Sequence, residues 1–217
     1  MQVIQLLVAG GVVMIPLLVL SIVAIALIAE RLRFWFRVTR RQRRVVRVAL
    51  GLYKEAGLDE TLICLKRNLD LPIVRIFIAA LSLDRPNPEE FRLALETEAQ
   101  AEIPILKRFT TAFDTIVMVS PLLGLLGTVT GLIRSFASLN LGNIGGTQTL
   151  QVTGGISEAL VSTATGLIVA IVTLMFANTF RGIYQRQTAL IQEYGGQLEL
   201  LYRQQYERQE DGYALTR

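Results

Sequence analysis

The stretch TGGISEALVSTATGLIVAIV, residues 153–172, decides what kind of protein this sequence encodes. Most of its residues are apolar enough for a lipid bilayer, yet it carries a glutamate, two serines and three threonines. A helix that only crosses a membrane would use leucine and valine, and an ionised Glu158 would be costly there. The polar residues therefore need an explanation of their own.

The apolar residues of the chain gather in three blocks, and these account for its apolar content of 52% and its mean hydropathy of +0.45. The blocks are residues 3–29, 112–139 and 153–178. Their charged side chains are Asp114, Arg134 and Glu158. Each block exceeds the roughly 20 residues that a helix needs to cross a bilayer. The sequence predicts an all-α integral membrane protein with three transmembrane helices.

The first block is too long for the apolar core of a signal peptide and has no basic segment before it, so we expect a retained anchor. The single cysteine excludes an intramolecular disulfide framework. Because the chain has no histidine, any proton handling must use carboxylates, hydroxyls or water. We expect no cofactor and no metal ion.

The placement of arginine predicts the orientation in the membrane. Arginines crowd the segment after the first block, whereas the loop NLGNIGGTQTLQ, residues 140–151, has neither lysine nor arginine. We therefore expect the N-terminus outside and the C-terminus in the cytoplasm. A basic collar at the cytoplasmic membrane surface explains the net charge of +4 better than nucleic-acid binding does. The collar comprises Arg31, Arg33, Arg37, Arg40, Arg41, Arg43 and Arg44.

These patterns predict six consecutive segments. They are a first transmembrane helix (1–30), a cytoplasmic helical region (31–108), a second transmembrane helix (109–139), a short periplasmic loop (140–152), a third transmembrane helix (153–179) and a cytoplasmic C-terminal helix and tail (180–217). Within the cytoplasmic region, Asn87 is expected to cap a helix that has Pro88 at its first position. Pro104 should kink or break that helix before the second span.

Helical periodicity places small and polar residues on one face of the second span and one face of the third. On the third span, Gly155, Ala159, Thr163, Gly166 and Ala170 share an arc of roughly 80°, with Glu158 and Ser162 at its edge. On the second span, Asp114, Gly124, Thr128 and Gly131 share an arc of about 100°. The rise per residue brings Thr128 and Thr163 to nearly one depth, about 12–15 Å below the outer surface.

These faces have two interpretations. Glycine and alanine stripes, such as the pair Gly127 and Gly131, commonly serve only close helix packing. Glu158 could extend to the outer interface, and Asp114 has the same possibility at the inner end. Ionisable residues within a membrane more often face a protein interior or a water path. The two stripes together favour a polar interior cavity lined by Thr128, Thr163, Glu158, Ser162 and Asp114.

The segments SPLLGLLGTVTGLIRSF (residues 120–136) and GGISEALVSTATGLIVAI (residues 154–171) closely resemble the ExbB/TolQ group of the MotA/TolQ/ExbB proton channel family. The match is specific through residues 109–193 and extends to three spans with the N-terminus outside. It implies a bacterial inner-membrane protein that forms a ring, commonly five-fold. Asp114 matches no family motif, and Pro104 stands where an unbroken helix is expected.

The resemblance also implies a mechanism. The pore of such a ring holds the single helices of an ExbD/TolR-like partner, whose membrane aspartate carries the proton. The family's pore threonines correspond to Thr128 and Thr163, and its glutamate corresponds to Glu158. The expected function is to couple the proton motive force to energised biopolymer transport or envelope work through a TonB/TolA-like protein.

Two other functions remain open from the residues alone. The first is a passive membrane scaffold whose small-residue stripes only assemble helices; Glu158 and the level threonines argue against it. The second is a membrane enzyme, for which the sequence offers neither metal-ligand spacing nor a nucleophile motif. Four-span stator proteins of the wider family resemble the chain less, because it has three spans.

Overall fold

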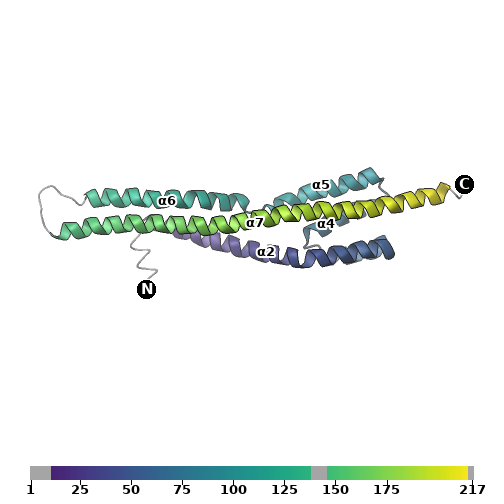
Figure 1. Cartoon of the computed structure of the whole chain (residues 1–217), viewed down its shortest axis with the longest axis horizontal. Coiled ribbons are helices and arrows are strands. Elements are labelled where there is room, and N and C mark those ends of the chain that lie inside the picture. The colour runs from purple at the N-terminus through teal and green to yellow at the C-terminus, as the bar shows by residue number, and fades with distance from the viewer. Residues whose placement is uncertain (1–10, 138–145, 215–217) are drawn as a thin grey trace. The chain divides into compact units, whose positions relative to one another are not determined.

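The helical periodicity of the sequence agrees with the structure, whose described residues are largely α-helical. The computed structural model describes residues 11–137 and 146–214, and its side chains except those of residues 146–152 and 209–214. Within these ranges each regular element is an α-helix (Figure 1). The helices are α2 (Met14–Glu55), α3 (Leu58–Lys66), α4 (Pro72–Leu81), α5 (Pro88–Leu106), α6 (Thr110–Ala137) and α7 (Gly146–Ala214).

Three helical stretches are long and apolar enough to cross a membrane. They are Met14–Glu55, Pro88–Ala137 (which covers α5 and α6) and Thr153–Arg208. The predicted all-α fold with three long apolar helices is thereby confirmed. Residues 1–10 of the first predicted span and 140–145 of the predicted loop lie outside the described residues, and α7 already begins at Gly146.

The chain divides into two compact units. Unit 1 contains Met1–Arg31 and Phe109–Arg181, and unit 2 contains Leu32–Arg108 and Gly182–Arg217. The long helices α2 and α7 each contribute to both units. The predicted membrane segments of α6 and α7 fall in unit 1, so this unit carries the residues that the sequence predicted to line a polar cavity.

Unit 1 is built on an antiparallel pair of helices, α6 and the first part of α7 (Figure 1). The start of α2 packs against this pair through a small apolar cluster of Val13, Met14 and Leu17, with Leu123 of α6 against it. At the end of the pair where α6 begins, the ring centroids of Phe113 and Phe180 lie 5.7 Å apart. Apolar contacts thus hold this end of the pair and its middle, where Leu123 lies.

Both ends of α5 follow from local sequence. The Asn87 side chain accepts a hydrogen bond from the Glu90 backbone N–H at 2.8 Å, and the Glu90 carboxylate accepts one from the Asn87 N–H at 2.8 Å. This capping box confirms the predicted start. The helix ends at Leu106, two residues after Pro104, and α6 begins only after Phe109, whose φ is +68°. The predicted break near Pro104 is confirmed.

Unit 2 has its core around α4, the most apolar of its short helices. Ile73, Phe77 and Ala80 are buried there. On the same helix Arg75 makes a two-pronged ion pair with Glu102 of α5, with both N–O distances at 2.5 Å. Because the Glu102 side chain is nearly buried, this pair fixes α5 against α4. Phe91 of α5 stacks on Tyr202 of α7, with centroids 4.0 Å apart.

Candidate functional site

Glycines allow α6 and α7 to approach at backbone distance. A Cβ added to Gly131 would lie 2.9 Å from the Ala159 Cβ, and one added to Gly124 would lie 3.0 Å from the Thr163 Cα. A Cβ on Gly166 would lie 2.5 Å from the Ser120 carbonyl oxygen. A side chain at these positions would force the neighbouring helix to shift, so glycine permits the close approach. The two small-residue faces predicted from the sequence therefore face each other within one chain.

The remaining small residues complete this interface. Gly127 packs against the Ser162 side chain, and Gly155 packs against the Ser135 hydroxyl. Ala159 and Ala170 are buried, at 3% and 7% exposure. The geometry matches close small-residue packing, which was one of the two interpretations of the stripes.

Most hydroxyls described on α6 and α7 donate to a carbonyl one turn back in their own helix. Thr128 donates to the Leu125 carbonyl at 2.6 Å, and Ser162 donates to the Ala159 carbonyl at 2.8 Å. Thr163 instead donates across the interface, to the Gly124 carbonyl of α6 at 2.9 Å. Thr163 is thus level with Gly124, one helical turn or about 6 Å from Thr128.

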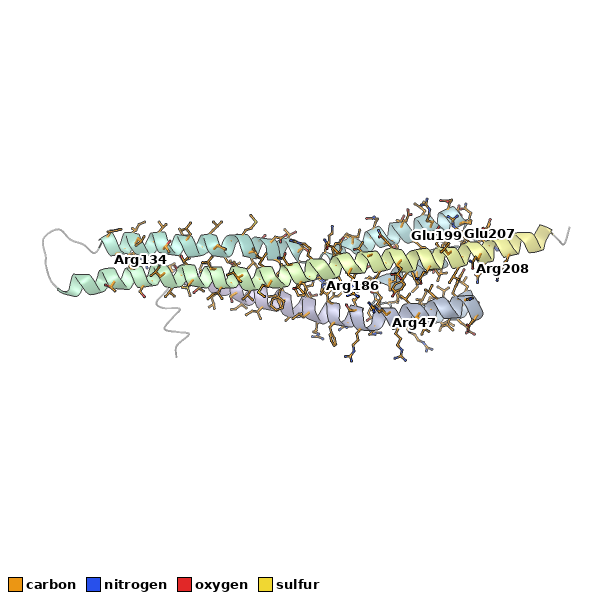
Figure 2. All side chains as sticks on the ribbon, in the orientation of Figure 1. Arg47, Arg134, Arg186, Glu199, Glu207 and Arg208 are labelled. Atoms are coloured by element: carbon orange, nitrogen blue, oxygen red, sulfur yellow. The ribbon has the colours of Figure 1, made fainter. Side chains whose placement is uncertain are left out.

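The loop end of the pair, next to residues 138–145, carries an ion pair between Arg134 of α6 and Glu158 of α7. Arg134 Nη1 lies 2.9 Å from Glu158 Oε1. The Glu158 side chain is 23% exposed and the Arg134 side chain 55%. Arg134 lies near the loop end of α6 (Figure 2). Glu158 was a predicted site residue, whereas its pairing with Arg134 was not predicted.

Gly11, just before α2, also lies against Glu158. Its φ of +70° is a left-handed conformation that favours glycine. A Cβ at this position would collide with the Glu158 carboxylate. The carboxylate is therefore held between the start of α2 and the last turns of α6.

The opposite end of the pair carries a second ion pair, between Asp114 of α6 and Arg181 of α7. Arg181 Nη2 lies 2.9 Å from Asp114 Oδ1, and each side chain is 48% exposed. Asp114 and Arg134 are 20 residues apart on α6, which corresponds to about 30 Å along a helix. That length matches the hydrocarbon core of a bilayer. The predicted site residues thus separate into Glu158 at the loop end, the hydroxyls in the middle and Asp114 at the base.

The predicted basic collar has members with different environments. Arg31 is only 2% exposed, and in unit 1 its guanidinium lies 5.5 Å from the centre of the Phe109 ring. In unit 2, Arg41 binds Asp70 at 2.6 Å and Asn68 at 2.8 Å. The other members are exposed along α2, namely Arg33, Arg37, Arg40, Arg43 and Arg44. Arg31 therefore packs inside unit 1 rather than facing the solvent.

Charged groups in the described ranges do not gather into a metal site. Among these residues, no group of three or more histidine, cysteine, aspartate and glutamate side chains could hold a metal ion. What the geometry does offer is hydrogen-bonding capacity within apolar helices: hydroxyl oxygens at mid-height and one carboxylate at each end.

Three long apolar helices, two of them locked together through glycines and hydroxyls, define a multi-pass helical membrane protein. Residues 68–193 match the MotA/TolQ/ExbB proton channel family. The ExbB-like 3 protein of Synechocystis sp. is 55% identical over 210 residues, which cover 96% of this chain and 100% of the relative. The chain belongs to the MotA/TolQ/ExbB proton channel family, a family of membrane proton channel proteins and not of known enzymes.

Two further relatives show how far the similarity extends. The ExbB-like 1 protein of Synechocystis sp. is 41% identical over 196 residues, covering 90% of this chain and 77% of the relative. The Tol-Pal system protein TolQ of Haemophilus influenzae is 36% identical over 119 residues, covering 52% of this chain and 49% of the relative. Thr128, Glu158 and Thr163 lie within the matched range of 68–193.

Proposed function

We propose that this chain is a proton-conducting motor subunit of a bacterial inner membrane. It assembles as a homo-oligomeric ring, a pentamer, around an ExbD/TolR-like single-span partner. The proton motive force is coupled through a TonB/TolA-like protein to work on the envelope. The observation that carries the proposal is the pair of hydroxyls of Thr128 and Thr163, one helical turn apart on adjacent apolar helices, in a chain that belongs to a proton channel family.

The hydrogen bonds of these threonines suggest how they act. Both hydroxyl protons are committed to backbone carbonyls, those of Leu125 and Gly124, so each oxygen presents its lone pairs. A protonated carboxyl group of the partner can donate to them directly. To stabilise the ionised carboxylate, a hydroxyl must turn away from its carbonyl, which costs about 1 kcal/mol for the lost hydrogen bond. Water held at this level can make the same exchange.

The described charges support the proposed orientation. Arg33, Arg37, Arg40, Arg43 and Arg44 are exposed on the part of α2 that belongs to unit 2. Arg33 and Arg44 are 11 residues apart, or about 17 Å along the helix, which exceeds the thickness of one headgroup layer. We propose that the arginines nearest the span contact lipid headgroups and that the remainder face the cytoplasm. The N-terminus is then periplasmic.

The names of the relatives support a role in biopolymer transport over a role in a Tol-Pal system. The two relatives that align with most of this chain are named ExbB-like, whereas the TolQ protein aligns with about half of it. We therefore favour energised biopolymer transport, of the kind named for those relatives, over a Tol-Pal role.

The glycine interface gives some support to a passive scaffold as the alternative function, because it explains most of the small residues without ion conduction. Proton flux separates the two functions. Vesicles that contain the chain and its single-span partner should take up protons down an imposed gradient, and vesicles that contain either protein alone should not. Equal, background uptake in all three preparations would support the scaffold.

A further inference from the structure

The ion pair at the loop end joins the only two charged side chains in a long stretch of the sequence. Between Asp114 and Arg181 the chain carries Arg134 and Glu158 and no other charged residue, and residues 1–29 carry none. In the structure these two side chains meet at 2.9 Å although they are 24 residues apart. Neither has another charged side chain from this part of the sequence with which it could pair.

The surroundings of Glu158 fix its carboxylate from two sides. Arg134 holds Oε1 from α6, and Gly11 leaves room for the same oxygen on the side of α2. A side chain at position 11 would occupy the place of the carboxylate. The position of Glu158 thus depends on Arg134 of α6 and on Gly11 in the segment just before α2.

Exposure indicates that this contact opens easily. Arg134 is 55% exposed in the single chain, and at the outer membrane surface, where the proposed orientation puts this end of α6, that side meets water, in which ion pairs contribute little to stability. A contact of this kind positions a group without locking it. Its neighbours in the described part of α6 and α7 are apolar, small or hydroxyl residues, so Arg134 supplies the charge that balances Glu158.

We propose that Arg134 is a positioning residue for Glu158. The two side chains form an ion pair without net charge, which holds the carboxylate at the periplasmic entrance of the proton path. The proposal rests on the proposed function, because it assigns Glu158 to that path. Arg134 acts only through Glu158: it aligns the carboxylate and releases it when a proton arrives from outside.

Chemical rescue tests this role with the full chain and its partner in vesicles. Arg134→Ala should lower proton uptake about tenfold, while the ring assembles and melts as the parent does. Arg134→Lys, which keeps the charge, should stay within about threefold of the parent. Millimolar guanidinium outside the vesicles should restore uptake by Arg134→Ala several-fold, and sodium at the same ionic strength should not. Arg92→Gln, which removes two exposed ion pairs of unit 2, those with Glu89 and Glu96, is the matched control and should leave uptake unchanged.

Glu158→Ala separates this proposal from the proposed function. It should lose uptake, and guanidinium should not restore it because the carboxylate is absent. Parent-like uptake by Arg134→Ala would overturn the positioning role, as would a loss that neither lysine nor guanidinium repairs. If the parent vesicles take up no protons, the proposed function itself fails.

Discussion

At the scale of single residues, the threonine hydroxyls carry the proposed mechanism. Valine nearly matches threonine in shape, so Thr128→Val and Thr163→Val should fold and assemble while losing the oxygen that we propose bonds to a partner carboxyl. We expect each to lose most proton uptake in vesicles with the partner, and serine at either position to retain more uptake than valine. Thr163→Val also removes the bond to the Gly124 carbonyl and should cost about 1 kcal/mol of stability. Parent-like conduction by both valine variants would reduce the threonines to packing residues.

The buried Tyr53 predicts that unit 2 loses stability at alkaline pH. Burial, with a smaller contribution from Tyr202, raises the pKa of Tyr53 to about 12 from its ordinary value of 10.0. In the unfolded chain Tyr53 ionises near pH 10, whereas in the folded chain it stays neutral. Its contribution to stability is therefore complete below pH 10 and is lost as the pH rises from 10 towards 12.

The tyrosinate absorbance, followed during an alkaline titration, measures this directly. The Tyr53→Phe variant keeps the ring and its packing, and should lack the last-titrating component of the parent. Its thermal stability should also fall less steeply with pH above 10. A Tyr53 that titrates together with the less buried Tyr184 and Tyr194 would contradict the burial of its side chain at 3% exposure.

At the scale of elements, the α6–α7 pair depends on backbone contact at Gly166. A methyl group there would meet the Ser120 carbonyl oxygen at 2.5 Å, and a backbone atom cannot turn aside as a side chain can. Gly166→Ala should therefore destabilise the protein by about 1–3 kcal/mol. Gly154 lies on the same helix with nothing within 4 Å of an added Cβ in this chain. Gly154→Ala is the matched control and should be neutral or stabilising by up to about 1 kcal/mol. Thermal melting in detergent compares them; equal shifts would argue against the tight contact.

The elements also show what a sequence can and cannot predict. Three long apolar helices, the cap at Asn87 and the break after Pro104 were predictable because composition and local hydrogen bonding decide them. Periodicity correctly grouped Gly124 with Gly131 and Gly155 with Gly166, but it states which residues share a face and not what lies opposite. The pairing of these faces within one chain required the structure. The partners of Glu158 and Asp114 were missed because they are 24 and 67 residues away, although the scarcity of charge around Arg134 was a usable signal.

At the scale of the whole molecule, charge separates the two units. Of 22 basic and 18 acidic residues, only Arg134 and Glu158 fall between positions 115 and 180. Figure 2 shows the contrast: Arg47 on α2 and Arg186, Glu199, Glu207 and Arg208 on α7 belong to unit 2, whereas Arg134 belongs to unit 1. A unit nearly free of charge suits a bilayer, and a charged unit suits water.

A single copy of unit 1 would expose polar groups to lipid. Each of its helices exposes large apolar side chains, such as Ile22 at 59%, Leu122 at 63% and Ile168 at 63%. Lipid can cover these at little cost. It cannot hydrogen-bond to the half-buried Thr128 hydroxyl or the partly exposed Glu158. Enclosing these groups in a ring of copies removes them from lipid and leaves an apolar exterior.

We therefore expect the chain to purify as a homo-oligomer. The family resemblance implies that it is a pentamer and that the partner helices are bound inside when the two are produced together. Native mass spectrometry in a mild detergent measures the number of copies with and without the partner. Because the interface joins largely apolar helices, a harsher detergent should release monomers without unfolding the charged unit 2, which circular dichroism would follow. A stable monomer that conducts protons with its partner would contradict the ring. The proton path would then have to lie within a single α6–α7 pair. The glycine contacts of that pair leave no room for a partner helix between α6 and α7.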